Sequence, residues 1–399
     1  MHLIESGNVA AATGVMLSRA QVIAAYPITP QTPLTEKLSE FVASGEMEAE
    51  YIPVESEHSA MAVCIAASSA GARTFTATSA NGLLYMSEQL HWAAGARLPI
   101  VMCVANRGIG APWTVWNDHQ DSVSQRDVGW IQLYANDHQQ IIDSVIKAFF
   151  LAETVSIPVM VCYDGYLLSH TYMPFEKPDQ DAVDAFLPPY NPIHFLDPEN
   201  PSNFNTVTLS EVRPDIHGQT APGYMEIRHA LHQDMRTAIE VLEEIDSRFF
   251  EKFARGGNPF VEPYCCSDAD HVVVCMGSLS YHFRDVIDLL REAGVKVGVM
   301  GIQLYRPFPD QAIVKALHGK RNVMVFEKAL SYGNQGALYA DTKSALYTTS
   351  EKPLMSNYIL GLGGREIKTR QLLDVVKASC ENPEKNGDTP IWIGLECQE

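Results

Sequence analysis

Three short segments of this chain hold residue types whose spacing could support chemistry. In the first, AAYPITPQTP (24–33), an apolar run ends in a turn where Thr29 stands between Pro27 and Pro30. Ligands of open α/β sheets bind beyond the carboxyl ends of the strands, so a hydroxyl group on this rigid turn is well placed. A proline-stiffened strand–helix turn, with Thr or Ser capping the helix, explains the same residues without a ligand.

The second segment, VESEHSAMA (54–62), places Glu55 and Glu57 where a helix of small residues should begin. Acidic side chains in the first turn of a helix interact favourably with the helix dipole, and the local sequence alone favours that explanation. The functional alternative is that Glu57, which leads a helix of Ala and Ser, is partly buried against a cofactor.

The third segment, ANRGIGAPWTVWNDHQDSVSQRD (105–127), is the most unusual stretch of the chain. Asn106 and Arg107 end an apolar run, and the Gly- and Pro-rich loop after them carries Trp113 and Trp116. A guanidinium group at the end of a central strand can bind a substrate carboxylate through two N–H groups. Loops so rich in special residues tend to be functional, and we weigh this role evenly against a surface loop anchored by its tryptophans.

The same segment contains His119 among several acidic side chains. The spacing of these residues is not that of a metal site, so we expect no metal there. Asp121 or Ser122 could instead cap a helix that follows the loop.

Asp164 and Gly165, in CYDGYLLSH (162–170), resemble part of another motif. Many thiamine-diphosphate enzymes bind the Mg²⁺ of the cofactor with G-D-G and an Asn further along the chain. Asn191 is present downstream, but Tyr163 stands in place of the first Gly. We therefore expect that this chain does not hold the diphosphate end of such a cofactor.

The elements that must position these residues follow an alternating pattern of apolar runs and helical stretches. Short strands separated by helices indicate a parallel α/β sheet with helices on both faces. The expected strands are 21–26, 72–79, 98–106, 130–134 and 157–165, and the expected helices are 32–44, 57–72, 82–96 and 138–155.

The domain organisation follows from where this texture changes. We expect a first α/β domain over residues 1–230 with a Pro- and Asn-rich excursion at 175–222, into which no strand or helix of useful length fits. A long amphipathic connecting helix should cover 224–257 and stop at a Gly pair. A second α/β pattern fills 258–399, which is a usual domain size.

Composition excludes several classes of function. Lys and Arg number 29 against 48 Asp and Glu, so the formal net charge is −19 and nucleic acids and anionic membranes should be repelled. We read no signal peptide and no membrane span, and expect a cytoplasmic protein. The eight cysteines form no C-x-x-C pair and GLGG (361–364) completes no G-x-G-x-x-G, so neither a metal cluster nor a phosphate fingerprint is visible.

Six motifs in this order resemble the alpha subunit of pyruvate:ferredoxin oxidoreductase (pyruvate synthase), in the 2-oxoacid:ferredoxin oxidoreductase family. They are YPITPQTP, VESEHSAM, TFTATSANGL, LPIVMCVANRG, DHQDSVSQRDVGWIQLY and DGYLLSH. The match spans nearly the whole chain and weakens after residue 175. YRPFP (305–309) and FEKALSYGNQGALYAD (326–341) resemble its second domain, which is transketolase C-terminal-like.

The resemblance implies that residues 1–230 form the pyrimidine-binding domain of a thiamine-diphosphate enzyme. The cofactor would be shared with a beta subunit, which holds the diphosphate and Mg²⁺. Gamma and delta subunits would carry [4Fe-4S] clusters, help to bind coenzyme A and pass electrons to ferredoxin. The implied reaction is the oxidative decarboxylation of a 2-oxoacid with acyl transfer to coenzyme A.

Site roles are carried over from the same motifs. Glu57 resembles the glutamate that hydrogen-bonds the aminopyrimidine and so promotes loss of the C2 proton. Arg107 would offset the charge of the substrate carboxylate until CO2 leaves. The implied cofactor-binding residues are Glu57, Pro27 and Asn81, and the implied substrate-binding residues are Thr29, Arg107 and Asn106.

The substrate and the electron acceptor remain open at this point. The loop after Arg107 departs from the pyruvate pattern, and Trp113 or Trp116 could line a pocket for phenylglyoxylate, shape a small site for pyruvate or oxalate, or only pack the loop. The intact YPITP favours pyruvate. A thiamine enzyme of transketolase type without redox chemistry, or a scaffold subunit, are the alternatives from other classes.

Overall fold

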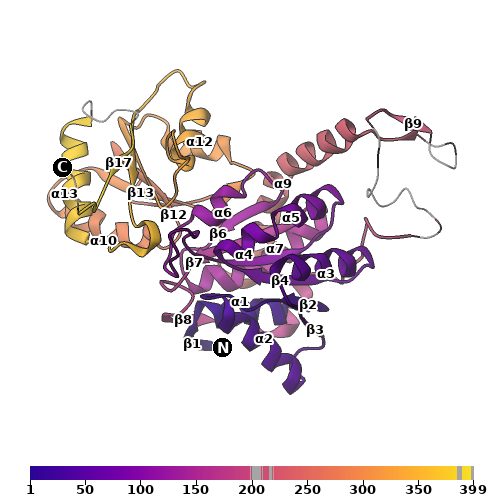
Figure 1. The fold of residues 1–399 in the computed structure, drawn as a ribbon. Coiled ribbons are helices and arrows are strands. Elements are labelled where there is room, and N and C mark those ends of the chain that lie inside the picture. Colours follow the sequence, from indigo (N-terminus) through magenta and orange to yellow (C-terminus); the bar gives the residue numbers. More distant parts are fainter. Residues whose placement is uncertain are drawn as a thin grey trace.

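The computed structural model describes residues 1–197, 199, 208, 210–214, 218, 220–383 and 389–396. Within this part of the chain, a seven-stranded and a six-stranded sheet form the centres of two α/β units (Figure 1). No helix among the described residues is long and apolar enough to cross a membrane.

The first sheet has the strand order β14-β6-β7-β5-β4-β2-β3. Its strands are parallel except β14, and most of their residues are fully buried, as expected for a sheet covered on both faces. The strands are β2 (Val22–Ala25), β3 (Glu50–Pro53), β4 (Thr74–Thr78), β5 (Val101–Asn106), β6 (Ile131–Tyr134), β7 (Val159–Asp164) and β14 (Leu304–Arg306).

One helix precedes β2, and helices follow five of the six parallel strands, whereas β7 is followed by another strand. These helices are α1 (Gly7–Leu17), α2 (Thr32–Ser44), α3 (Glu57–Ser69), α4 (Ala80–Tyr85), α5 (Ser87–Gly95), α6 (Gln120–Ser124) and α7 (His138–Val155). The single helix expected over 82–96 is in fact two helices, because the chain breaks at Met86.

The segment after β7 is more regular than the sequence suggested. β8 (Tyr172–Glu176) pairs with β1 (His2–Ser6), and the expectation of no useful helix in the excursion is wrong, because α8 (Gln180–Phe186) forms there. The aromatic ring of Phe186 packs edge-on against Phe249 at 5.2 Å, so the excursion is anchored by burial despite its proline content.

The long helix α9 (Tyr224–Phe253) connects the two units and packs along α7. It ends before the predicted Gly pair, where Ala254 takes a left-handed conformation. Its first turns project from the body of the molecule, and the short strands β9 (Arg213–Pro214) and β10 (Thr220–Ala221) lie at the far end (Figure 1).

The second sheet has the order β11-β13-β12-β15-β16-β17, parallel except for β11. Its strands are β11 (Val261–Tyr264), β12 (His271–Met276), β13 (Val297–Ile302), β15 (Asn322–Glu327), β16 (Leu354–Ile359) and β17 (Ile391–Trp392). Its helices are α10 (Leu279–Glu292), α11 (Asp310–Leu317), α12 (Ala337–Leu346), η2 (Leu362–Gly364) and α13 (Thr369–Glu381).

The two units are joined by more than the connecting helix. β14 follows directly after β13, yet it pairs antiparallel with β6 and becomes an edge strand of the first sheet. No strand was expected at 304–306. A three-residue strand carries too little periodicity to be read from sequence, and its place is set by a partner far away in the chain.

Candidate active site

Four of the sequence-predicted residues lie at one edge of the first sheet. Thr29 follows β2, Glu57 follows β3, Asn81 follows β4 and Arg107 follows β5. These four strands are parallel neighbours, so their carboxyl ends meet at the same edge. This is the position where ligands bind in open α/β sheets.

Glu57 is buried at the beginning of α3, with 7% of its surface exposed. The hydroxyl group of Ser56 caps this helix by accepting a hydrogen bond from the Ser59 N–H at 3.2 Å, which fixes the backbone at Glu57. Among the described residues, the Glu57 carboxylate has neither a hydrogen bond nor an ion pair. A buried carboxylate usually has such a partner, so this one is available to a ligand.

Gly82, in α4, leaves room for that carboxylate. A Cβ atom on Gly82 would lie 2.5 Å from the Glu57 Oε1 atom and 2.5 Å from the Thr78 Oγ1 atom, closer than real contacts allow. The Thr78 hydroxyl group is itself buried without a hydrogen-bond partner in the described part of the chain. Sequence reasoning missed both residues, although the glycine after TATSAN was visible.

Arg107 extends from the end of β5 toward the turn after β2. Its Nη1 atom donates a hydrogen bond to the Thr29 carbonyl oxygen at 2.6 Å, while its buried Nε atom has no partner among the described residues. Burial lowers the pKa of the Arg107 guanidinium, whereas the charges of Asp121, Tyr166 and Glu57 raise it. The Arg107 side chain therefore presents a partly satisfied, desolvated cation on the same sheet edge as Glu57.

Asn106 faces the interior of the loop that follows it. Its fully buried Nδ2 atom donates hydrogen bonds to Asp121 Oδ1 at 2.7 Å and to Ser122 Oγ at 2.5 Å, and its Oδ1 atom has no partner within the described residues. The structure thus gives Asn106 a role in holding the loop. Its predicted contact with substrate stays a prediction.

Asn81 and Pro27 are both exposed at this edge. Asn81 accepts a hydrogen bond from the Gly110 N–H at 3.0 Å and donates one to the Gly110 carbonyl oxygen at 3.5 Å, so it fastens the loop after β5 to α4. Within the described residues, neither side chain forms a hydrogen bond or ion pair with Glu57. Their predicted cofactor contacts remain predictions.

The two tryptophans of this loop differ in their surroundings. Trp113 is 73% exposed, and the carbon at the centre of the Arg107 guanidinium lies 5.4 Å from its ring. Trp116 packs against Tyr166, with ring centroids 4.7 Å apart, and against the backbone of Gly364. Trp116 therefore packs the loop, whereas Trp113 borders the cation of the site.

The second unit holds this loop from the other side. The Gly363 N–H donates to Asp118 Oδ2 at 3.0 Å, and the Gly364 N–H donates to the Asn117 carbonyl oxygen at 2.7 Å. The glycine-rich turn GLGG thus uses its N–H groups to bind the loop. This accounts for a glycine cluster that forms no phosphate fingerprint.

Asp164 of the incomplete D-G motif is fully buried in a network between the two units. Lys328 donates to Asp164 at 2.9 Å, and His119 and Ser278 bond the same carboxylate. Burial raises the pKa of Asp164, but the Lys328 ammonium and His119 outweigh it and hold the pKa well below its ordinary value. Asp164 and His119 are therefore engaged with each other and with Lys328 at a domain contact.

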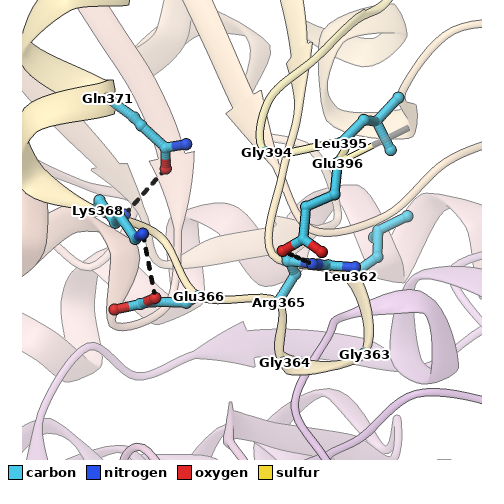
Figure 2. A pocket seen from close by; sticks show the side chains of 10 residues that line it. All are labelled: Leu362, Gly363, Gly364, Arg365, Glu366, Lys368, Gln371, Gly394, Leu395 and Glu396. Atoms are coloured by element: carbon cyan, nitrogen blue, oxygen red, sulfur yellow. Dashed lines mark hydrogen bonds and ion pairs between the residues drawn. The ribbon is translucent and has the colours of Figure 1, made fainter. Parts of the chain in front are cut away.

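A cavity of about 550 Å³ lies beside GLGG and is lined by Arg365 and Lys368 (Figure 2). Arg365 pairs with Glu396 at 2.5 Å, and Lys368 lies 3.8 Å from Glu366. Because each cation faces a carboxylate, the cavity is not an evident site for an anion.

Comparisons with known proteins agree with this arrangement. Residues 13–236 match the family described as "Pyruvate flavodoxin/ferredoxin oxidoreductase, thiamine diP-bdg", and residues 269–372 match "Pyruvate:ferredoxin oxidoreductase core domain II". The fold resembles a 2-oxoglutarate:ferredoxin oxidoreductase from Magnetococcus marinus, with TM-score 0.71 and 22% identity, over 95% of this chain and 65% of that chain. It also resembles a split-gene transketolase, with TM-score 0.55 and 11% identity, over 94% and 98%.

Curated relatives are closer in sequence. Ketoisovalerate oxidoreductase subunit VorA of Pyrococcus furiosus is 46% identical over 98% of this chain and 98% of its own length. Pyruvate synthase subunit PorA of Methanocaldococcus jannaschii is 45% identical over 98% and 97%.

Fold and site together define a pyrimidine-binding-type α/β domain followed by a transketolase C-terminal-like domain, which confirms the expected fold class. The chain belongs to the 2-oxoacid:ferredoxin oxidoreductase family and is an alpha subunit of such an enzyme. The alternatives of a transketolase-type enzyme without redox chemistry and of a scaffold subunit are not favoured.

Proposed function

We propose that this alpha subunit takes part in the thiamine-dependent oxidative decarboxylation of pyruvate to acetyl-CoA and CO2, a reversible reaction. The observation that carries the proposal is the buried Glu57 carboxylate, which lacks a partner in the described chain and lies against Gly82 on the same sheet edge as Arg107. An acceptor and a cation at the same sheet edge suit a cofactor ring and an anionic substrate.

The residues around Glu57 fit an aminopyrimidine. Its carboxylate would accept a hydrogen bond from the ring, and the Thr78 hydroxyl group, which has no partner within the described part of the chain, lies on the same side of Gly82. Thiamine diphosphate supplies, when bound, a nucleophilic carbon for attack on the 2-oxo group. Glu57 would promote the loss of the proton at that carbon through the ring.

Arg107 would bind the carboxylate of the 2-oxoacid. Its Nε atom is buried and has no partner among the residues that the structure describes, and one of its terminal nitrogens is already fixed by the Thr29 carbonyl oxygen. A pre-positioned guanidinium loses little freedom on binding, and its attraction for an anion is strong where water is excluded. Release of CO2 removes the charge that Arg107 offsets.

The choice of pyruvate rests on the intact YPITP motif of the turn that carries Thr29. The loop after β5 departs from the pyruvate pattern, and its Trp113 ring lies 5.4 Å from the central carbon of the Arg107 guanidinium. Ketoisovalerate, a branched 2-oxoacid, is the second candidate, because relatives named for it are as similar to this chain as relatives named for pyruvate. Phenylglyoxylate and oxalate are not favoured.

Partner subunits would supply what this chain does not. Asp164 is engaged by Lys328 and His119, which supports placing the diphosphate and Mg²⁺ in a beta subunit. Gamma and delta subunits with [4Fe-4S] clusters, coenzyme A and ferredoxin would complete the reaction.

The test is an assay of the purified native complex with coenzyme A, a viologen acceptor and a panel of 2-oxoacids. We expect thiamine-dependent viologen reduction that is fastest with pyruvate. Replacing Glu57→Gln should lower kcat by about 10²–10⁴-fold, the usual contribution of a group in general acid–base catalysis. Glu55→Gln, two residues away and exposed, is the matched control and should stay near wild type.

A complex without thiamine-dependent reduction of viologen would overturn the redox assignment. Full activity in the Glu57→Gln variant would overturn the role of that carboxylate. A preference for ketoisovalerate would replace pyruvate with the second candidate.

A further inference from the structure

We propose that Asp121 is a positioning residue that holds the two halves of the site in one geometry, an inference that rests on the proposed function. The sequence suggested only a helix cap for Asp121. In the structure it lies inside α6, and its side chain is fully buried at the carboxyl ends of β4 and β5.

Among the described residues, the hydrogen bonds of the Asp121 carboxylate run to the site or to its own helix. Oδ2 accepts hydrogen bonds from the Ala80 N–H at 2.9 Å and the Arg107 N–H at 3.0 Å. Oδ1 accepts from Asn106 Nδ2 at 2.7 Å and from the Ser122 N–H at 2.8 Å. One oxygen atom therefore connects the first residue of α4 to Arg107, the residue that follows β5.

Each tied backbone group leads to one half of the site. Ala80 begins α4, and two residues later Gly82 forms the wall against the Glu57 carboxylate. Arg107 continues to the carbonyl oxygen of Thr29. A small shift of α4 against β5 would therefore change the room around Glu57 and the reach of Arg107 together.

The Asp121 hydrogen bond to Ala80 holds a strained backbone conformation. Ala80 has a φ of 45°, in the left-handed region that is strained for a non-glycine residue. Strained backbone at a functional site persists only when surrounding contacts fix it, and the Asp121 carboxylate accepts the N–H of that residue.

The charge of Asp121 also acts on the site. Burial raises the pKa of Asp121 to about 6, while the bonds from Asn106, Arg107 and Ala80 lower it. The carboxylate is therefore charged at neutral pH, and it favours the cationic form of Arg107, which burial disfavours. A neutral amide would keep the shape of the side chain and lose this effect.

The experiment compares Asp121→Asn with Asp118→Asn in the assembled complex. Asp118 is a buried carboxylate of the same loop, but its bonds run to the Gln120 and Gly363 N–H groups and not to the strand ends. Each oxygen atom of the Asp121 carboxylate accepts two hydrogen bonds from N–H groups. In Asp121→Asn an NH2 group replaces one of these oxygen atoms and cannot accept a hydrogen bond, so the two bonds to that atom must break. We expect kcat/KM to fall about 10²-fold for Asp121→Asn, as for a slightly misplaced site, and only a few-fold for Asp118→Asn.

A second readout does not depend on activity. Amide hydrogen exchange without substrate should be faster at Ala80 and Arg107 in Asp121→Asn, and unchanged there in Asp118→Asn. Equal effects of the two variants on kcat/KM, or unchanged exchange at both amides, would overturn the proposal. Should Asp121→Asn fail to assemble, rapid exchange of these two amides in the wild-type complex would contradict it equally.

The outcome is separable from that of the proposed function. A wild-type complex that does not reduce viologen with any 2-oxoacid would refute the function, whereas the exchange measurement would still decide whether Asp121 holds α4 to β5.

Discussion

The Glu57 carboxylate shows how an ordinary residue acquires a special environment. At the start of a helix an acidic residue is normally exposed and stabilised by the dipole, which is what local sequence favoured. Here a glycine opposite leaves the carboxylate buried, without a partner in the described chain. Removing that space should therefore disturb Glu57 as much as changing Glu57 itself.

We predict that Gly82→Ala impairs the enzyme without unfolding the chain. The added Cβ would lie 2.5 Å from Glu57 Oε1, so the carboxylate must move, and kcat should fall by about 10²-fold or more. The control is Gly95→Ala in α5, where a Cβ would meet nothing closer than 3.8 Å. Steady-state kinetics of both complexes decide it, and a fully active Gly82→Ala enzyme would contradict the close contact.

Part of the site could be predicted from single segments and part could not. Thr29 and Arg107 could be placed at the sheet edge because each follows an apolar run, and Glu57 could be placed there through the motif that begins its helix, whereas their roles stay predictions. Thr78 and Gly82 were missed, because their importance depends on contacts among the end of β4, α4 and the start of α3. Asp121 was read as a cap, since nothing in sequence shows that its carboxylate reaches backward to Ala80.

Contacts between elements depend on a buried ion pair. Lys328, just after β15, donates to Asp164 at the end of β7 and to Asn117 in the loop after β5, both at 2.9 Å. Both charged side chains are almost completely buried, so each relies on the other for compensation. This pair fixes the second unit against the loop that follows Arg107.

Lys328→Met should therefore destabilise the protein by about 3–5 kcal/mol, because the buried Asp164 charge loses its ammonium partner and keeps the bonds from His119 and Ser278. The double variant Lys328→Met, Asp164→Asn should recover part of that loss. Lys37→Met, which removes an exposed pair with Glu40, should cost about 0–1 kcal/mol. Chemical unfolding measures all three, and equal losses for Lys328→Met and Lys37→Met would show that the buried pair contributes little.

A second buried carboxylate, that of Glu327, makes the stability of the second unit depend on pH. Glu327 at the end of β15 accepts the Leu338 and Tyr339 N–H groups at the start of α12. Burial raises the pKa of Glu327 from 4.5 to about 8, although these bonds lower it. Because the folded pKa lies above the unfolded one, its contribution to stability is complete below pH 4.5 and is lost as pH rises through about 8.

We predict that the wild-type Tm falls relative to the Tm of Glu327→Gln as pH rises from about 6 to 9, since Gln cannot ionise. Thermal unfolding of the two proteins at several pH values is the measurement. A constant difference in Tm across this window would show that Glu327 does not titrate there.

Element boundaries were predictable where periodicity was strong, as in α7 and α9. The break between α4 and α5 was not visible, because both halves continue the same apolar pattern through Met86. β14 was missed because its pairing with β6 joins segments far apart in the chain.

The whole chain carries a net charge of −19, yet its candidate substrate is an anion. The structure reconciles these facts locally, since the buried Arg107 cation lies where the ends of parallel strands converge and water is scarce. The two domains are joined by β14, which follows β13 of the second unit and pairs with β6 of the first sheet, and by the buried Lys328–Asp164 ion pair. Under the proposed function, a beta subunit would bring the diphosphate end of the cofactor to the sheet edge that carries Glu57 and Arg107.

The most direct test of this account is a structure of the assembled complex with thiamine diphosphate bound. We predict that the Glu57 carboxylate lies within hydrogen-bond distance of the aminopyrimidine ring, about 2.6–3.2 Å between heavy atoms. A map that shows Glu57 facing solvent, or the ring bound elsewhere on the sheet edge, would contradict it.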